Sequence, residues 1–202
     1  MGDGERARAL RLFVAISVPD AVKDEMEKAQ REMHSALPGG FMRWTKREQF
    51  HLTLKFLGNV AEARVAELVE TLRKTCVQFK AMQLLAERVG FFPDARFPRV
   101  VWAGVRDEKE GLPRLQGMIE AATKDFTGEK AEKRFTGHVT LARIQGIRRP
   151  QAEILARFSA GMADRFFGDW KANEVELIHS ELSSGGARYT TLAAFPLLRK
   201  ND

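Results

Sequence analysis

Residues 51–54, His51-Leu52-Thr53-Leu54, and residues 138–141, His138-Val139-Thr140-Leu141, share one pattern of histidine, an apolar residue, threonine and leucine. Side chains on a β-strand alternate between its two faces. Each copy therefore places histidine and threonine together on one face and an apolar residue in the core behind them. Two such strands facing each other would line one cleft with two imidazoles and two hydroxyls.

The remaining chain predicts strands and helices in a mixed order. With 202 residues it is long enough for one sizeable domain or two closely associated lobes, and we expect a single domain over residues 1–202. Because the order is not a regular βαβ alternation, we predict an α+β fold with largely antiparallel sheets. The expected elements are strands at 12–18, 51–57, 82–89, 99–105, 138–144, 173–182 and 188–198, with helices after Pro19 and at 61–76, 112–126 and 150–158.

Composition indicates the kind of partner and the cellular compartment but does not decide the function. The formal net charge of +6 and the pI near 9.7 favour polyanionic partners only weakly. Cys76 is the one cysteine, which excludes an intramolecular disulfide, and we expect it to be a semi-buried side chain rather than a nucleophile. The apolar run at 12–18 is too short for a signal sequence or a membrane span. We expect a cytoplasmic monomer with no membrane association and no protein partner.

The paired motif suits one class of chemistry. Hydrolysis of a cyclic phosphodiester needs a base on the attacking water and an acid on the leaving oxygen, on opposite sides of phosphorus. Histidine titrates near neutrality, so one neutral and one protonated copy can coexist. Threonine hydroxyls can donate to the phosphoryl oxygens. One such strand motif is more often structural than catalytic, but two copies with the same parity favour catalysis. The sequence has no metal-binding motif, so we expect neither a metal nor another cofactor.

Four segments, in order, resemble one known family: Leu12-Phe13-Val14-Ala15-Ile16, the octet at 51–58, the hexapeptide at 138–143, and Gly186-Ala187-Arg188-Tyr189. They are similar to the bacterial and archaeal 2H phosphoesterases known as RNA 2′,3′-cyclic phosphodiesterase or 2′-5′ RNA ligase (LigT/ThpR). The resemblance runs from about Arg11 to Leu198. It implies a bilobed fold with two pseudo-symmetric lobes, mainly antiparallel sheets flanked by helices, and a central cleft lined by one HxT strand from each lobe. It also implies metal-independent opening of RNA 2′,3′-cyclic phosphates to 2′-phosphates, accompanied by reversible 2′-5′ ligation.

The resemblance also implies roles for particular residues. His51 and His138 are the expected catalytic pair, and Thr53, Thr140 and Arg143 are expected to bind the substrate phosphate. Arg143 has the opposite strand parity to His138 and Thr140, so it reaches the cleft only through a bulge, a strand end or its own length. Which histidine is the acid and which the base stays open, because the pseudo-symmetry makes them alike.

The first motif has no arginine in the matching position. It offers Lys55, which is either a phosphate ligand or a strand lysine at the edge of the cleft. The second motif has Gly137 where the family often has proline, a conservative departure. Phe56 is expected in the core, and His34 and His179 are expected to be structural.

Two alternatives to an RNA phosphodiesterase stay open. One is a 2H phosphoesterase for another small ester, such as a cyclic nucleotide or ADP-ribose cyclic phosphate. The other is a non-catalytic module that binds RNA ends. Lys130, Lys133 and Arg134 either guide an RNA backbone or are simply solvated, and Phe92 and Phe97 are weak candidates for a base platform.

Overall fold

The fold was analysed in a computed structural model, which describes residues 8–37, 40–130, 134–183 and 186–198. Within these ranges the predicted α+β architecture is confirmed. The strands are β1 (Ala9–Ser17), β2 (Met42–Trp44), β3 (His51–Ala61), β4 (Met82–Phe92), β5 (Val100–Arg106), β6 (His138–Ile144), β7 (Phe166–Ala172), β8 (Glu174–Ser183) and β9 (Gly186–Pro196). The helices are α1 (Asp20–Ala36), α2 (Val65–Cys76), α3 (Gly111–Thr123) and α4 (Arg149–Ala160).

The strands form two antiparallel sheets that interleave along the chain. One sheet has the order β3-β1-β8-β9 and the other the order β2-β6-β5-β4-β7. The two motif strands, β3 and β6, belong to different sheets but contact each other where the sheets meet. This arrangement supplies one HxT strand from each sheet, as the sequence predicted.

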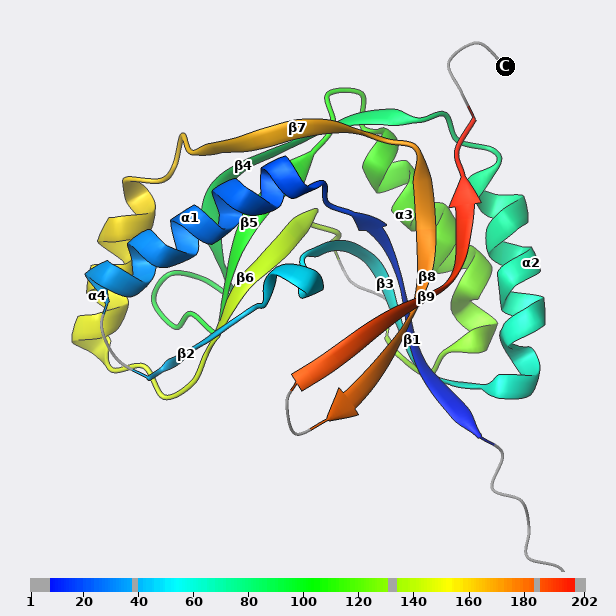
Figure 1. The fold of residues 1–202 in the computed structure, drawn as a ribbon, viewed down its shortest axis with the longest axis horizontal. Helices are drawn as coiled ribbons and strands as arrows, with labels where there is room; N and C mark the ends of the chain where they lie inside the picture. Colours follow the sequence, from blue (N-terminus) through cyan, green and yellow to red (C-terminus); the bar gives the residue numbers. More distant parts are fainter. Residues whose placement is uncertain (1–7, 38–39, 131–133, 184–185, 199–202) are drawn as a thin grey trace, which may run out of the picture.

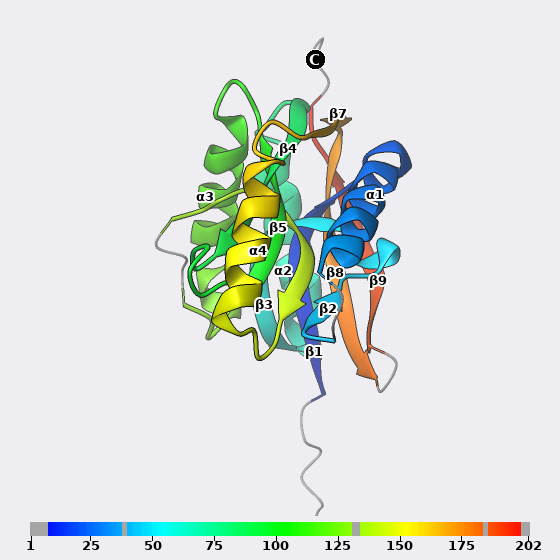
Figure 2. The same cartoon turned by 90° about the vertical axis from the view of Figure 1, so that its left-hand side faces the viewer.

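The helices cover the two sheets separately. Helices α1 and α4 pack on the five-stranded sheet through β7 and β4, whereas α2 and α3 pack on the four-stranded sheet through β8, β9 and β3. They lie toward opposite ends of the molecule in Figure 1, and α1 and α3 appear on opposite sides in the turned view of Figure 2. A single apolar core joins the inner faces of both sheets and includes Leu52 and Leu54 of β3 and Val139 and Leu141 of β6. The apolar residues of both motifs are therefore structural, as expected.

Each motif strand carries a β-bulge directly after its threonine. In β3, Val14 pairs with Lys55 but Ala15 pairs with Thr53, so Leu54 is an extra residue. In β6, Val101 pairs with Ala142 and Trp102 pairs with Thr140, so Leu141 is the extra residue. A bulge reverses the alternation of faces beyond it. The fifth residue after each histidine, Phe56 or Arg143, therefore returns to the face of that histidine.

The structure departs from the expected elements at a few places. Strands β2 and β7 were not predicted: β2 has only three residues, and β7 contains Gly168 and Asp169, which are unfavourable in strands. Strand β3 continues past Gly58, whose φ of 64° is accessible to glycine without strain, to Ala61. The predicted helices at 61–76 and 112–126 each contain a short 3₁₀ turn at one end, over Glu62–Arg64 and Lys124–Phe126.

Candidate active site

His51 is the first residue of β3 and lies opposite Ser17 of β1. Its imidazole is packed edge-on against two aromatic rings, with centroid separations of 6.1 Å to Phe13 and 5.5 Å to Tyr189. The carboxylate of Glu176 on β8 is held by the Ser17 hydroxyl at 2.5 Å and carries a negative charge toward the same imidazole. His51 is thus half-buried between aromatic side chains and one carboxylate.

His138 begins β6 in the other sheet and lies opposite Gly104 of β5. Its ring also meets two aromatic side chains, Phe92 at 4.9 Å and Trp102 at 6.3 Å between centroids. The two motif histidines therefore occupy equivalent positions at the starts of their strands, each against an aromatic wall.

Both motif imidazoles interact with the backbone two residues earlier. His138 Nδ1 lies 2.7 Å from the carbonyl oxygen of Thr136, which fixes a proton on Nδ1 in the neutral ring. His51 interacts with the backbone of Gln49, and within the described residues its buried Nδ1 has no hydrogen-bond partner. The shared offset extends the pseudo-symmetry of the motifs to their backbone neighbours.

Burial is the largest influence on the ionisation of His51. It lowers the pKa of the imidazole below its ordinary value of 6.5, because a charged ring loses solvation there. The Gln49 carbonyl and the Glu176 carboxylate oppose this shift, and the Lys23 charge adds to it. The net shift is downward, so the surroundings of His51 favour its neutral form, the form that acts as a general base.

Thr53, Thr140 and Arg143 lie on the faces of their histidines. Both threonines are half-buried, and within the described residues neither hydroxyl forms a side-chain hydrogen bond. Arg143 is exposed and is brought round by the Leu141 bulge, which is one of the routes anticipated from its parity. Two hydroxyls and a guanidinium are thus available beside the imidazoles for an anionic ligand.

Contacts between the sheets bring these faces toward a common space. The Arg143 charge acts on the Tyr189 phenol of the other sheet, although burial has the larger effect and raises the pKa of that phenol. The Gln49 side chain donates a 2.6 Å hydrogen bond to the Ala187 carbonyl at the start of β9. Arg143 is therefore close enough to Tyr189, which contacts His51, for its charge to be felt across the junction.

The sequence also matches a family model. The model described as LigT like Phosphoesterase matches residues 16–102 and 104–189, two stretches that each contain one HxT motif. The chain belongs to the LigT-like phosphoesterases. The resemblance found in the sequence is confirmed, including the inference that the protein is an enzyme of this family.

Curated relatives of this LigT-like chain share one name. A protein of Archaeoglobus fulgidus named RNA 2′,3′-cyclic phosphodiesterase is 32% identical over 92% of this chain and 99% of its own length. One from Aeropyrum pernix with the same name is 35% identical over 79% of this chain and 86% of its own length. Among solved structures, a Thermus thermophilus protein superposes with a TM-score of 0.76 at 28% identity, covering 95% of this chain and all of that one. E. coli LigT complexed with 3′-AMP shares the fold, with a TM-score of 0.72 at 23% identity over 94% of this chain and 99% of that one.

Lys55 does not join the HxT residues. The bulge at Leu54 turns its side chain to the opposite face, where it is 5% exposed and Nζ lies 2.6 Å from the Glu120 carboxylate of α3. The sequence left Lys55 as either a phosphate ligand or a strand lysine at the edge of the cleft. The buried ion pair with Glu120 fits neither interpretation. Phe56 was expected in the core, and this is wrong: the same bulge turns it outward, where it is 50% exposed and its ring lies 5.9 Å from Phe13.

Other candidates lie elsewhere. His34 is exposed beside Trp44, and His179 shares its strand face with core residues of β8. Cys76 is fully buried, and burial raises the pKa of its thiol to about 12, so it is no nucleophile at neutral pH. Arg134 is described and exposed, whereas Lys133 lies outside the described residues.

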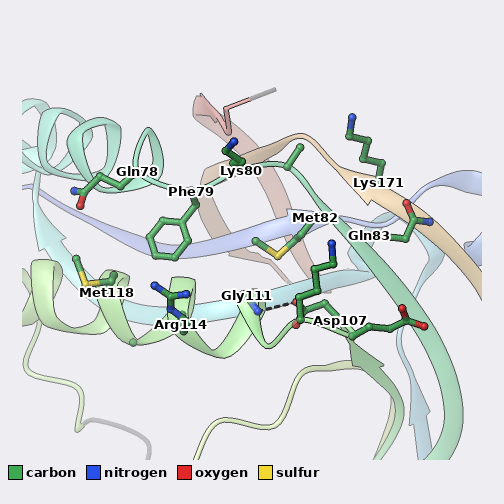
Figure 3. Close-up of a pocket in the computed structure, with 14 residues that line it drawn as sticks. Gln78, Phe79, Lys80, Met82, Gln83, Asp107, Gly111, Arg114, Met118 and Lys171 are labelled. Atoms are coloured by element: carbon green, nitrogen blue, oxygen red, sulfur yellow. Dashed lines mark hydrogen bonds between the residues drawn. The ribbon is translucent and has the colours of Figure 1, made fainter. Parts of the chain in front are cut away.

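One large cavity has neither motif histidine in its lining. It has a volume of about 1060 Å³ and is formed by the end of α2, the start of β4 and the first turns of α3 (Figure 3). Arg114, Lys80 and Met82 line it, and none of the predicted site residues does.

In the described part of the chain, no group of three or more histidine, cysteine, aspartate or glutamate residues is gathered as metal ligands. No described helix is long and apolar enough to cross a membrane.

Several residues of the site were missed from the sequence. Glu176 and Trp102 reach it from strands whose neighbours only the tertiary fold defines. One signal was present in the sequence. Aligning the two motifs on their histidines places Phe56 opposite Arg143, so the role that the resemblance implies for Arg143 also indicated that Phe56 faces the site.

Proposed function

We propose that this protein hydrolyses RNA 2′,3′-cyclic phosphate ends to 2′-phosphates, with His51 and His138 as a general acid–base pair and without a metal ion. The observation that carries the proposal is the matched geometry of the two histidines. Each begins a strand, interacts with the backbone two residues earlier, and has a threonine two residues later whose hydroxyl forms no side-chain hydrogen bond within the described residues. The names of the curated relatives support the choice of substrate.

The reaction follows from these positions. The neutral imidazole of the pair takes a proton from water through Nε2, and the water oxygen attacks phosphorus in line with the ribose 3′ oxygen. The bond between phosphorus and the 3′ oxygen breaks, and the protonated imidazole gives its proton to that oxygen. The products are a 2′-phosphate and a free 3′ hydroxyl, and the two histidines have exchanged protonation states.

Thr53, Thr140 and Arg143 bind the phosphoryl oxygens in this scheme. The threonine hydroxyls donate hydrogen bonds, and the guanidinium offers a charge-assisted pair of N–H donors as negative charge builds on phosphorus. Since Arg143 has Phe56 as its counterpart in the first motif, the two sides are not equivalent. Phe56 and Tyr189 offer an aromatic surface for a nucleobase near His51, while the cation lies near His138.

We propose 2′-5′ ligation as a second reaction of the same site. If the 5′ hydroxyl of a second RNA replaces water, its oxygen attacks the cyclic phosphate and the 3′ oxygen leaves. The product is a 2′-5′ phosphodiester, with the same proton transfers by the two histidines. The reverse step is cleavage of that linkage.

The test is a substrate panel run with wild-type protein in excess EDTA. It compares an RNA oligonucleotide ending in a 2′,3′-cyclic phosphate, a 2′,3′-cyclic mononucleotide, a 3′,5′-cyclic mononucleotide and ADP-ribose 1″,2″-cyclic phosphate. We expect the RNA end to be opened to a 2′-phosphate, identified by its new sensitivity to alkaline phosphatase and by its comigration with an authentic 2′-phosphate standard. Turnover of only another ester would replace the substrate, loss of all turnover in EDTA would refute the metal-free scheme, and binding without turnover would indicate an RNA-end-binding module.

A further inference from the structure

Arg88 lies at a β-bulge in β4, where the register shifts between Glu87 and Val89. Its φ is 54°, a left-handed conformation that is costly for a residue with a side chain. Bulges beside active sites re-aim side chains, and this one turns Arg88 toward the face that carries His138. The Arg88 side chain is exposed. Within the described residues its guanidinium has no carboxylate partner.

Two neighbours define where this guanidinium lies. Cζ of Arg88 is 5.8 Å from the Trp102 ring centre, and Trp102 is in turn 6.3 Å from the His138 ring. Nε of Arg88 is 3.3 Å from the position that a Cβ would take on Gly104, the residue directly opposite His138. Gly104 has no side chain, so Trp102 is the side chain of β5 that lies near both Arg88 and His138.

Trp102 is itself held in place by a glycine. A Cβ on Gly90 would lie 2.3 Å from the Trp102 ring, so the ring lies directly over Gly90. The indole thus forms a fixed platform, with the Arg88 guanidinium at one side and the His138 imidazole at the other. An arginine stacked on an aromatic ring keeps its N–H donors free for a phosphate.

Arg88 and Arg143 approach the site from different positions along the sheet. Arg143 pairs with Val100 and His138 pairs with Gly104, four residues further along β5, which separates the two backbone positions by about 13 Å. The Arg88 guanidinium starts beside Gly104 and His138, whereas that of Arg143 starts beyond Thr140. A hollow of about 330 Å³ opens beside Arg88 and is also lined by Arg134 and Thr136, just before His138.

The carboxylates of this hollow are mostly engaged. Glu87 is paired with Arg106 at 2.6 Å, and Asp107 accepts hydrogen bonds from the backbone N–H groups of Gly111 and Leu112. Within the described residues Glu110 forms no ion pair, and neither do Arg88 and Arg134. The hollow has three carboxylates and three arginines, but two of the three side chains left without an ion pair or hydrogen bond are arginines.

From this arrangement we propose that Arg88 and Arg134 form a second phosphate subsite, which binds the phosphodiester on the 5′ side of the terminal nucleotide of an RNA. The inference rests on the proposed function and deepens it. It makes a polynucleotide end, rather than a cyclic mononucleotide, the preferred substrate, because a mononucleotide has no phosphate for this subsite.

The test compares two substrates in parallel: an RNA trinucleotide ending in a 2′,3′-cyclic phosphate and the matching 2′,3′-cyclic mononucleotide lacking a 5′ phosphate. For Arg88→Gln we expect kcat/KM on the trinucleotide to fall roughly tenfold, with the value for the mononucleotide within about twofold of wild type. Arg88→Lys keeps a cation and should recover part of the loss. Arg134→Gln should act in the same direction. The salt dependence of trinucleotide binding should lose about 0.7 from its log–log slope in Arg88→Gln.

Arg114→Gln is the matched control, because it removes one equally unpaired arginine from the cavity of Figure 3 and changes net charge identically. It should leave both substrates unaffected. Equal losses on both substrates in Arg88→Gln, or equal effects of Arg88→Gln and Arg114→Gln, would overturn the subsite. Failure of wild type to hydrolyse either substrate would instead overturn the proposed function, so the two failures are distinct.

Discussion

The buried ion pair between Lys55 and Glu120 separates a structural lysine from a phosphate ligand. Lys55→Met leaves the Glu120 carboxylate without its cation. Breaking a fully buried pair costs about 3 to 5 kcal/mol, because one charge stays desolvated. The Lys55 side chain is 4% exposed but that of Glu120 is 21% exposed, so the carboxylate partly recovers its hydration. We therefore expect a loss of about 2 to 3 kcal/mol, which lowers the Tm of a chain of this size by roughly 4 to 12 °C.

Thermal and urea unfolding measure this loss, and turnover of a cyclic-phosphate RNA measures the effect on the site. The control is Lys55→Met/Glu120→Leu, which removes both charges and should recover more than half of the lost stability, since apolar replacements of buried pairs are often neutral. The kcat/KM of the folded Lys55→Met protein should stay within about threefold of wild type. Unchanged stability together with a loss of tenfold or more in kcat/KM, by the same conversion, would show that Lys55 acts on the substrate and would refute this reasoning.

Three further changes test the site. Arg143→Ala should lower kcat/KM by roughly 10²-fold, with partial recovery in Arg143→Lys, as steady-state kinetics would reveal; an unaffected Arg143→Ala would remove this residue from phosphate binding. Glu176→Gln removes a charge that raises the pKa of His51, so one limb of the pH profile of kcat/KM should move to lower pH: the acidic limb if His51 is the base, the alkaline limb if it is the acid. If neither limb of the pH profile moved, the charge of Glu176 would not act on His51. Gly90→Ala should cost about 1 to 3 kcal/mol in urea unfolding through overlap with the Trp102 ring, and an unchanged unfolding midpoint would contradict the stacking.

Much of the fold was predictable because local patterns and tertiary structure agree. The alternation in His51-Leu52-Thr53-Leu54 and in its second copy identifies both strands and their core faces, and the structure buries both apolar residues of each copy as expected. The candidate site was predicted from the same residues, because histidine and threonine occur at the same spacing in both copies. A pattern that occurs twice with the same parity carries information that one copy lacks.

The errors arise where one extra residue changes a strand. Alternation alone puts Lys55 on the side of His51 and Phe56 in the core, and the bulge at Leu54 reverses both. The equivalent bulge at Leu141 is what allows Arg143 to join the site. Bulges depend on the fit between neighbouring strands, so no local signal in the sequence locates them. Arg88 was missed for the same reason, since its orientation depends on another bulge.

The measurement that tests the central claim most directly is single-turnover hydrolysis of an RNA ending in a 2′,3′-cyclic phosphate, with His51→Ala and His138→Ala beside wild type. His34→Ala is the matched control, because His34 is exposed on α1 and lies outside the site. The paired-histidine scheme predicts that each motif variant, folded by circular dichroism, loses at least about 10²-fold in rate while His34→Ala retains the wild-type rate. A motif variant that stays folded and keeps the wild-type rate would contradict the scheme.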